Sequence, residues 1–472
     1  MEWRRGISGL RWRGRRAWVG LWACGLAAAG CSGPVGPGEH AADRPDILLI
    51  SLDTVRADHL TPYGYARDTT PALRRFAEQG ALFTRSWSQS SSTVPTHASL
   101  FTSLWPHQHG VFAYPESLPE DAVTLTEHLR DHGYRTFCFA SSTRFHAGSG
   151  FFQGCDVSEA FEEDPKNSRS ARVNRRALAE MGRDDGAPFF GFLHYVDAHE
   201  PYAPPEPFRF RWHAGLEAPR PEETSEFLQA HRWPAREVSP EVLDYLRGLY
   251  DGAISYQDAA LAELFAALDA TPRGRDVLVV ITSDHGEEFK EHGGLSHAVH
   301  LHEELVRVPL LVRWFGRIAP GRRLEAAAQT VDIFPMLTDL ASVPTPPGIV
   351  GRSFADALLG RVDPESPRSR RDALELVVLQ QSEETWALSA TLSTGRFKLL
   401  VHRGGEPALF RLDEDPRGLS PVDAEYGAEK QQLLKISRQL QVGTAEGRML
   451  GPLRVPEDPE VLERLRSLGY TR

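Results

Sequence analysis

The chain has 472 residues and a formal net charge of −11, and 41% of its residues are hydrophobic and 25% charged. This composition is ordinary for a soluble globular protein, and the length allows a large core with a smaller companion domain. Residues 1–30 contain six arginines and one glutamate, so the rest of the chain carries about −16. Such a surface repels nucleic acid and anionic lipid, and we expect no nucleic-acid partner. An anionic substrate would instead need a local cation, most naturally a metal ion.

The N-terminus has the pattern of an export signal. The arginine-rich MEWRRGISGLRWRGRR precedes the apolar AWVGLWACGLAAAG, which is too short to span a bilayer comfortably. This segment ends in AAAGC, which resembles the lipobox of bacterial lipoproteins and implies acylation of Cys31. We therefore predict a signal peptide at 1–30, a flexible linker at 31–44 and an outer-membrane lipoprotein that faces the periplasm or the exterior. An ordinary cleaved signal peptide and an uncleaved anchor are the alternatives.

Two cysteines, Cys138 and Cys155, lie beyond the N-terminal segment. An exported, oxidising compartment would allow them to form a disulfide. Two buried free thiols are the alternative, and the sequence favours neither interpretation.

Short apolar runs alternate with amphipathic segments between residues 45 and 370. The run ILLISL at 47–52 is apolar throughout, as expected of a strand that is covered on both faces. Further strands are predicted at 134–140, 188–196, 276–283 and 308–314. Helices are predicted at 69–80, 123–133, 240–270 and 331–341. This alternation predicts an α/β fold with a mostly parallel sheet sandwiched by helices, in which ligands bind at the carboxyl ends of the strands.

The pattern changes after residue 370. Apolar runs predict a small antiparallel set of strands at 374–381, 384–394, 395–403 and 407–416, followed by helices at 427–441 and 458–468. We predict a main domain at 45–370 and a small C-terminal α+β subdomain at 371–472. The stretch 200–238 is rich in Pro, Arg and aromatic residues and is expected to be a long excursion near the strand ends.

Aspartates and histidines follow several predicted strands, and one threonine begins a predicted helix. They are Asp53, Thr93, His194, Asp197, His199, Asp284 and His285. Each alone is more simply a turn former, a helix cap or a structural histidine. Because they recur at the same kind of position, carboxylates and imidazoles are expected to meet at one sheet edge and to bind one divalent cation. Carboxylate oxygens favour Ca²⁺ or Mg²⁺, and histidine also admits Mn²⁺ or Zn²⁺.

Five motifs follow one another along the chain: LDTVRADHLTPYGY, TVPTHASLFTSLWPHQHGV, FLHYVDAHEPYAPP, SDHGEEFKEHG and EELVRVPLLVR. A chain with these motifs in this order resembles the sulfatase family of the alkaline phosphatase superfamily. The resemblance is nearly continuous from residue 45 to about 345, and GRFKLL, ALFRLDEDP and LERLRSLGY are similar to C-terminal parts of the family. It implies the alkaline phosphatase/sulfatase-like fold, with a small antiparallel subdomain at the C-terminus.

The resemblance also implies a set of metal ligands. Asp53, Asp284 and His285 match ligands of the family, and the hydroxyl of Thr93 would join them. Thr54 stands where sulfatases often have a second aspartate, so one family ligand is absent.

A second metal is not predicted. The related phosphodiesterases and alkaline phosphatases bind a second zinc through an aspartate and a histidine four residues later. Here Asp197 is followed by His199, and position 201 is a proline. A one-metal centre of the sulfatase type is therefore expected.

Three histidines take positions of family residues that contact the substrate. His199 matches the histidine at the ester group, and His297 falls where members place a lysine or histidine on the transferred oxyanion. His97 replaces the arginine of the signature Cys-x-Pro-Ser-Arg. Arg144 and His146 are similar to a Lys-x-His element of many sulfatases, but they lie about three residues out of step, and we interpret them as surface loop.

Thr93 takes the place of the signature cysteine. Sulfatases oxidise that cysteine, or a serine, to formylglycine, whose hydrate attacks sulfur and then expels sulfate by elimination. Oxidation of a threonine would give a ketone, so we expect no formylglycine and predict direct attack by a metal-activated hydroxyl. TVPTHASLFTS also resembles the nucleophile segment of nucleotide pyrophosphatase/phosphodiesterases, in which a threonine is phosphorylated directly.

These observations predict a membrane-tethered, metal-dependent hydrolase of the sulfatase family. Its substrate would be a sulfate or phosphate ester of a small molecule, a glycan or a lipid head group, and the threonine favours the phosphoester. A phosphoryl transferase that uses the same first step is one alternative. A non-catalytic lipoprotein that binds anions or glycans is the other, because a fold alone does not establish an activity. The oligomeric state is not assigned.

Overall fold

The computed structural model of the chain describes most of the residues between 44 and 439. The described residues are 44–114, 116–145, 147–161, 169–212, 221–231, 237–298, 300–362, 378–381, 385–392, 395–402 and 406–439. The predicted signal peptide, Cys31 and the predicted helix at 458–468 lie outside them, and Arg44 is the one residue of the predicted linker that they include. Among the described residues, no helix has the length and apolar character needed to cross a membrane.

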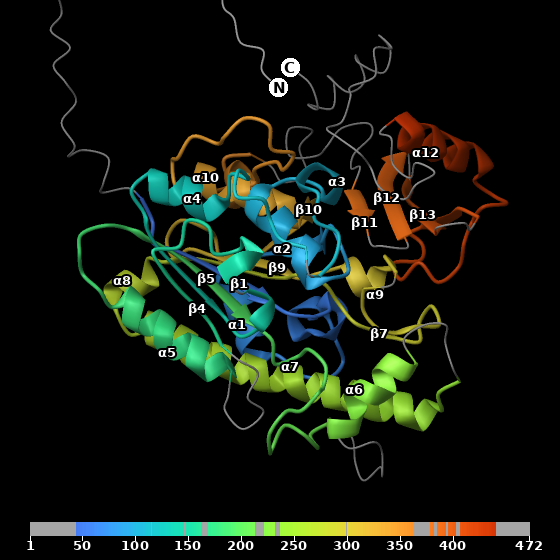
Figure 1. The fold of residues 1–472 in the computed structure, drawn as a ribbon, viewed down its shortest axis with the longest axis horizontal. Helices are drawn as coiled ribbons and strands as arrows, with labels where there is room; N and C mark the ends of the chain where they lie inside the picture. Colours follow the sequence, from blue (N-terminus) through green and yellow to red (C-terminus); the bar gives the residue numbers. More distant parts are fainter. Residues whose placement is uncertain are drawn as a thin grey trace, which may run out of the picture. The chain divides into compact units, whose positions relative to one another are not determined.

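An eight-stranded sheet forms the centre of the fold (Figure 1). In spatial order its strands are β10 (Arg322–Gln329), β2 (Ala81–Trp87), β9 (Leu310–Arg313), β6 (Leu278–Ser283), β1 (Ile47–Leu52), β5 (Phe189–Tyr195), β3 (Arg135–Ala140) and β4 (Val157–Ala160). Neighbouring strands pair in parallel except at β9, which is antiparallel to both β2 and β6. Every residue of β1, β5 and β6 is buried, as their continuous apolar runs predict. The predicted mostly parallel α/β fold is confirmed.

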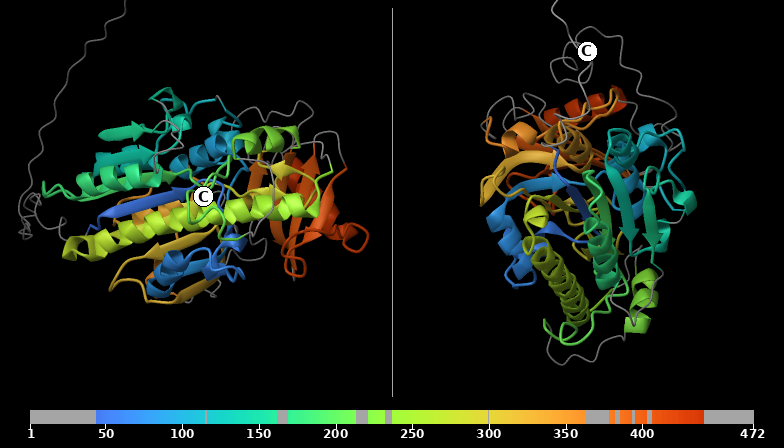
Figure 2. Two further views of the ribbon diagram at one scale, coloured as in Figure 1. Left: turned by 90° about the horizontal axis from the view of Figure 1, so that it is seen from below. Right: turned by 90° about the vertical axis from the view of Figure 1, so that its left-hand side faces the viewer.

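Helices cover both faces of this sheet (Figures 1 and 2). One face packs against α2 (Thr93–Thr102), α4 (Leu125–Asp131) and α10 (Ile333–Leu340), and the other against α1 (Pro71–Gln79), α5 (Arg169–Met181) and α7 (Pro240–Asp269). Successive residues of a strand point to opposite faces, so Ile47 and Leu49 of β1 enter the first apolar cluster, and Leu48 and Ile50 enter the second. Each face of the sheet is therefore covered by an apolar cluster and a layer of helices.

Shorter elements lie in the connections. They are α3 (Pro106–His109), α6 (Pro221–Ala230), α8 (Pro272–Arg275), α9 (Glu303–Val306), α11 (Ala355–Leu358), the hairpin of β7 (Glu288–Phe289) and β8 (Leu295–Ser296), and 3₁₀ turns at Ala57–His59, Thr61–Tyr63, Thr143–Phe145, Ala147–Ser149 and Thr330–Asp332. The stretch 200–238, predicted as an excursion near the strand ends, contains α6, which packs beside β8.

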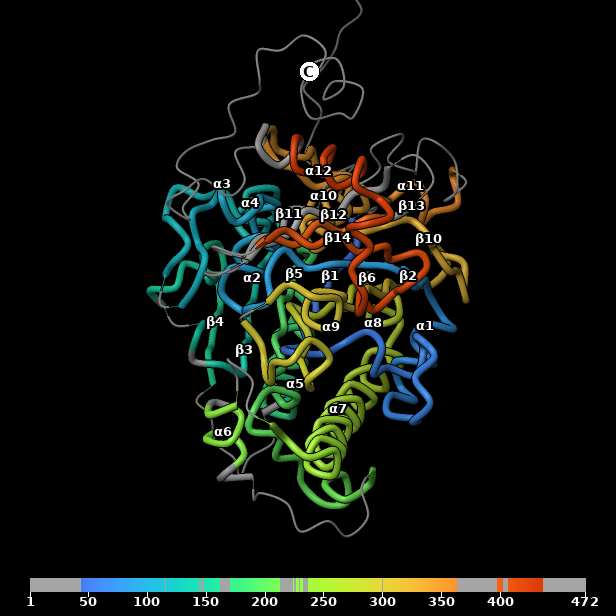
Figure 3. Tube along the Cα trace, turned by 90° about the vertical axis from the view of Figure 1, so that its right-hand side faces the viewer, coloured from blue at the N-terminus to red at the C-terminus, as the bar shows by residue number. Residues whose placement is uncertain are grey.

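A second sheet lies near the C-terminus. Its antiparallel strands are β11 (Val378–Gln381), β12 (Thr385–Leu392), β13 (Gly395–His402) and β14 (Ala408–Arg411), and α12 (Gly427–Gln439) follows them. Figure 3 views the chain from the side on which this sheet lies, close to α9. A buried ion pair of 2.8 Å between Lys398 of β13 and Glu303 joins this sheet to α9. The antiparallel C-terminal set is thus as predicted, whereas the predicted boundary at 370/371 falls outside the described residues.

A disulfide joins Cys138 in β3 to Cys155. The alternative of two free thiols is therefore wrong for this structure. The bond closes the chain between the end of β3 and the start of β4, a segment that carries Arg144 and Phe145.

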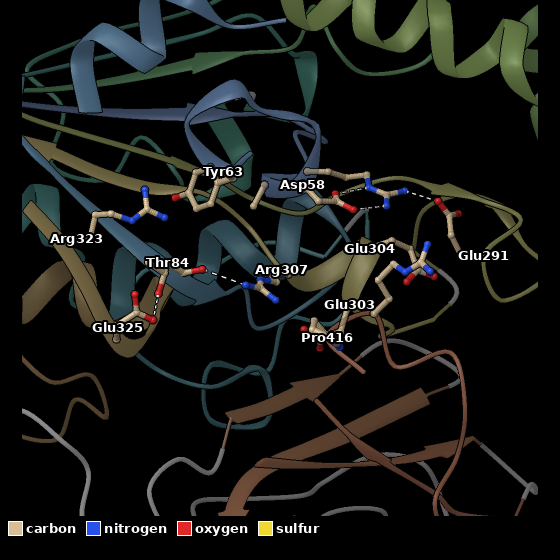
Figure 4. Close-up of a pocket in the computed structure, with 13 residues that line it drawn as sticks. Asp58, Tyr63, Thr84, Glu291, Glu303, Glu304, Arg307, Arg323, Glu325 and Pro416 are labelled. Carbon is tan, nitrogen blue, oxygen red and sulfur yellow. Dashed lines mark hydrogen bonds and ion pairs between the residues drawn. The ribbon is translucent and has the colours of Figure 1, made fainter. Parts of the chain in front are cut away.

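Arg56 connects the loop after β1 to the loop after β6. Its guanidinium donates to both carboxylate oxygens of Asp58, at 2.9 and 2.8 Å, to Glu291 Oε1 at 2.7 Å and to the backbone oxygen of Glu287 at 2.9 Å. Arg56, Asp58 and Glu291 border a cavity of about 470 Å³, and Figure 4 shows Asp58 and Glu291 on one side of it and Glu325 on the other. Because the Arg56 side chain is only 4% exposed, its contacts set the spacing between the two loops.

We expect Arg56→Ala to lower the free energy of unfolding by about 3–5 kcal/mol, because Glu291 would stay largely buried without its partner. Arg74→Ala is the matched control, since it breaks an exposed pair with Asp68 and should cost about 1 kcal/mol or less. Urea unfolding followed by tryptophan fluorescence measures both losses. Equal losses in the two variants would contradict a structural role for Arg56.

Candidate active site

The carboxyl ends of β1 and β6 lie side by side. The strands pair in parallel with Leu52 opposite Ser283, so Asp53 and Asp284, which follow these residues, are neighbours. His285 is the next residue along the chain. The expected convergence of these three residues at one sheet edge is what the structure has.

Backbone groups hold one oxygen of Asp284 in place. Asp284 Oδ1 accepts hydrogen bonds from the backbone N–H of His285 at 2.8 Å and from that of Thr54 at 3.1 Å. Thr54 has a left-handed backbone conformation, with φ of 61°, which is uncommon for a β-branched residue and indicates local strain. The Tyr250 hydroxyl donates to the Thr54 backbone oxygen at 2.6 Å and supports this conformation. The strained turn therefore leaves Asp284 Oδ2 as the oxygen that faces the site.

Three carboxylate oxygens at this edge are buried and have no hydrogen-bond partner in the described part of the chain. They are both side-chain oxygens of Asp53 and Oδ2 of Asp284. His285 Nε2 lies 3.7 Å from Asp53 Oδ1 and 3.6 Å from Asp284 Oδ2, while its Nδ1–H donates to the Gly286 oxygen at 2.9 Å. Uncompensated buried carboxylates are costly, and this set of oxygens with one imidazole nitrogen fits a divalent cation.

The electrostatics of the two carboxylates agree with that interpretation. Burial raises the pKa of Asp284 well above its ordinary range, and the neighbouring charge of Asp53 raises it further. Burial lowers the pKa of His285, which keeps its ring neutral and Nε2 available as a ligand. A bound cation would allow both aspartates to be ionised together.

Thr93 faces the same group. It is the first residue of α2, and its Oγ1 lies 3.4 Å from His285 Nε2. The side chain is 3% exposed. The amino end of a helix carries a partial positive charge, so an anion bound beside Thr93 is favoured.

His97 holds the start of this helix. Its Nδ1 lies 2.7 Å from the Thr93 backbone oxygen, and its Nε2 lies 2.9 Å from Ser51 Oγ. Burial lowers the pKa of His97 to about 3, and nearby His194 contributes, so the ring is neutral, with Nδ1–H donating and Nε2 accepting. His97, a candidate catalytic residue by its place in the signature, thus has both of its nitrogens bonded to protein groups.

His199 and His297 border the site from the loops after β5 and β8. The ring of His297 lies 4.5 Å from that of His285 and 4.9 Å from that of His199. His297 Nδ1 bonds Glu287 Oε1 at 3.0 Å, and His199 Nδ1–H donates to the Glu200 oxygen at 2.7 Å. Burial lowers the pKa of His199 to about 4. Both predicted histidines therefore lie at the cluster of Asp53, Asp284 and His285.

Two further residues lie at the site: Arg144, and His194, which the sequence analysis expected at this sheet edge without giving it a role. Arg144, interpreted as surface loop, places Nη1 3.3 Å from His199 Nε2, so that interpretation is wrong. His194 of β5 lies with Nε2 3.4 Å from Asp53 Oδ2. Its signal was a histidine inside an otherwise apolar, fully buried strand. His146 is outside the described residues, and Asp197 accepts a hydrogen bond from Ser170 of α5.

Comparison with known proteins gives the same family from two parts of the chain. The pattern of the Sulfatase family matches residues 45–343, and that of the N-sulphoglucosamine sulphohydrolase C-terminal region matches residues 291–444. Arylsulfatase K of Gallus gallus is 25% identical, and the alignment covers 88% of this chain and 85% of that protein.

Solved structures share the fold. The phosphonate monoester hydrolase of Agrobacterium radiobacter superposes with a TM-score of 0.67 at 21% identity, over 84% of this chain and 96% of that one. A protein solved in complex with its substrate D-glucosamine-2-N,6-O-disulfate superposes with a TM-score of 0.63 at 17% identity, over 84% and 97%. The matched sequence pattern, the strand order and the carboxylate cluster together lead to one conclusion: this chain belongs to the sulfatase family, and it is a hydrolase.

Proposed function

We propose that this chain cleaves an anionic ester by direct attack of Thr93 Oγ1, with one divalent cation bound at Asp53, Asp284 and His285. The observation that carries the proposal is the position of Thr93 Oγ1, 3.4 Å from His285 Nε2 and beside carboxylate oxygens that lack partners among the described residues. A hydroxyl in this position lies where a nucleophile must lie, at the edge of a cation site and at the amino end of a helix.

The chemistry of threonine favours phosphorus over sulfur. A formylglycine hydrate has a second hydroxyl and can expel sulfate by elimination, whereas Thr93 has only one oxygen on its side chain. The adduct on Thr93 must therefore be resolved by water that attacks the central atom. Phosphoryl groups are transferred by such in-line displacements. We therefore propose a phosphate or phosphonate ester as the preferred substrate and a sulfate ester as the poorer one.

The cation would be Ca²⁺, Mg²⁺, Mn²⁺ or Zn²⁺, and its ligands would be Asp53, Asp284, His285 and the Thr93 oxygen. When bound, it would neutralise the carboxylates, lower the pKa of the Thr93 hydroxyl and withdraw charge from the ester oxygens. Other residues of the site would position the nucleophile, bind the transferred group and protonate the leaving oxygen.

His97 positions the nucleophile, because it fixes the Thr93 backbone against Ser51 at the end of β1. Arg144 would bind oxygens of the transferred group as the main positive charge, and His199 would position it, because His199 Nε2 lies 3.3 Å from Arg144 Nη1 and can accept from it. His297 bonds Glu287 through Nδ1, and in its protonated form it would donate a proton from Nε2 to the leaving oxygen.

The proposed reaction has two displacements. In the first, Thr93 Oγ1 bonds to phosphorus, its proton leaves for solvent, and the bond from phosphorus to the leaving oxygen breaks as that oxygen takes a proton from His297. In the second, water bonds to phosphorus and gives a proton to His297, the bond from phosphorus to Thr93 Oγ1 breaks, and Thr93 Oγ1 takes a proton from solvent. If an alcohol takes the place of water, the same residues perform a phosphoryl transfer.

We also propose that the protein is exported and anchored through Cys31, as its N-terminal sequence predicts. The Cys138–Cys155 disulfide supports export, because such bonds persist in oxidising compartments. Labelling with a fatty-acid analogue, compared between the wild type and Cys31→Ala, tests the anchor.

One prediction of the proposed mechanism concerns the nucleophile. We expect Thr93→Ala to lower kcat on aryl phosphate mono- and diesters by a factor on the order of 10³ or more, because no other hydroxyl would replace the attacking oxygen. Thr93→Ser keeps the hydroxyl and should retain measurable turnover. The assay uses Ca²⁺, Mg²⁺, Mn²⁺ or Zn²⁺ in turn, with an aryl sulfate as a second substrate. Aryl sulfate turnover that persists in Thr93→Ala would contradict the proposed nucleophile. Metal binding without turnover of any substrate would favour the non-catalytic alternative.

Another prediction of the proposed mechanism concerns Arg144. Arg144→Ala should raise KM for the aryl phosphate by about 10- to 100-fold, with a smaller effect on kcat, because a charge-assisted contact to the substrate is lost. Arg144→Lys should recover part of the loss. Arg176→Ala serves as a control, since Arg176 pairs with Glu159 at a half-exposed position. A KM for Arg144→Ala equal to that of the control would place Arg144 outside the binding site.

A further inference from the structure

His194 is a buried histidine without an ordinary partner. It lies in β5 with 0% of its surface exposed, and in the described chain neither ring nitrogen has a hydrogen bond. Its ring packs against those of Phe145, at 4.5 Å, and His97, at 5.2 Å. Buried polar groups are nearly always hydrogen-bonded in native proteins, so one that is not requires an explanation.

The ring nitrogen Nε2 lies beside the carboxylate of Asp53. It lies 3.4 Å from Oδ2, whereas His285 Nε2 lies 3.7 Å from Oδ1. Asp53 is therefore flanked by one imidazole at each oxygen, and no described residue donates a hydrogen bond to either oxygen. This arrangement suits ligands that share an ion better than a hydrogen-bonded pair.

His194 also belongs to a second group of ligand atoms. His97, His194 and Asp284 come within 4.8 Å of one another, as do Asp53, Asp284 and His285, and Asp284 is common to both groups. Both nitrogens of His97 already bond Ser51 Oγ and the Thr93 oxygen. His194 is thus the member of the second group whose nitrogens remain available.

We propose that His194 Nε2 is an additional ligand of the one cation in the proposed site, and that this second imidazole makes the site selective for Mn²⁺ or Zn²⁺ over Ca²⁺ and Mg²⁺. The inference rests on the proposed function, since it assumes the cation at Asp53, Asp284 and His285. Two nitrogens among the ligands favour transition metals, whereas Ca²⁺ and Mg²⁺ prefer oxygen alone.

The test uses the full chain after removal of metal by EDTA. His194→Phe keeps an aromatic ring against Phe145 and His97 and removes both nitrogens. The matched control is His107→Phe, because His107 is also buried and also lacks a hydrogen-bond partner within the described chain, but it belongs to neither group of ligand atoms. Calorimetric titrations with Mn²⁺, Zn²⁺ and Ca²⁺ give the affinities and the stoichiometry.

We expect the wild type and the control to bind one Mn²⁺ or Zn²⁺ more tightly than Ca²⁺. His194→Phe should raise the Kd for Mn²⁺ and Zn²⁺ by about 10- to 100-fold and change the Kd for Ca²⁺ by much less. Pulsed EPR of the Mn²⁺-loaded protein should detect two coupled imidazole nitrogens in the wild type and one in His194→Phe.

Thermal unfolding separates a ligand from a structural histidine. Without metal, His194→Phe should be at least as stable as the wild type, because it removes an unpaired buried polar group. The rise in Tm on adding Mn²⁺ should be smaller in the variant. Lower stability without metal, combined with an unchanged Kd for Mn²⁺, would overturn the proposal.

Two outcomes distinguish this proposal from the proposed function. One coupled imidazole in the wild type, with binding lost in Asp53→Asn, would reject His194 as a ligand and leave the cation site of the proposed function in place. No binding of any cation by the wild type would reject both. Two bound Mn²⁺ ions per chain would reject a single shared cation.

Discussion

The buried negative charge of Asp53 and Asp284 is the constraint on which the rest of the site depends. Two carboxylates at adjacent strand ends, with three oxygens that lack partners in the described chain, cannot both be ionised in a dry site without compensation. The imidazoles of His285 and His194 and the amino end of α2 surround these oxygens. Burial keeps the His285 ring neutral and the helix end carries only a partial positive charge, so neither supplies the full compensation. A divalent cation does, which is why the proposed chemistry starts from it.

The loops that carry the two carboxylates are held by contacts outside the site. Arg56 ties the loop after β1 to Glu291 and to the Glu287 backbone. Gly286 allows the loop after β6 to pass close to α9, since a Cβ there would lie 2.0 Å from the Glu304 oxygen. His292 continues the connection, with Nδ1 at 2.7 Å from Glu304 and Nε2 at 2.7 Å from the Gly418 oxygen beyond β14. The C-terminal sheet thus supports the ligand loops of the main sheet, and its loss would disturb them.

The sequence predicted the parts of this arrangement that depend on local pattern. Continuous apolar runs identify β1, β5 and β6, and a polar residue directly after such a run lies at the carboxyl edge, which locates Asp53 and Asp284. Arg144 was misplaced because its contact with His199 depends on the path of the turn after β3, and no periodicity encodes that path. His194 was expected at this sheet edge but was given no role, because its role depends on the register that sets it opposite Ser51 and beside Asp53.

In the proposed mechanism, Thr93 determines whether the site cleaves phosphate or sulfate esters. In the family's usual chemistry, a hydrate with two oxygens releases its product by elimination, so the bond broken last is on the protein side of the adduct. In the proposed mechanism, Thr93 has one oxygen, so water must make the second attack on the central atom, and the groups that orient the first attack would also serve the second. His297, fixed through Glu287, and Arg144 beside His199 lie on the side of the cluster where they could perform both steps. Selectivity between phosphorus and sulfur would then arise from the resolution of the adduct, because the two ester groups present similar oxygens to the same cations when they bind.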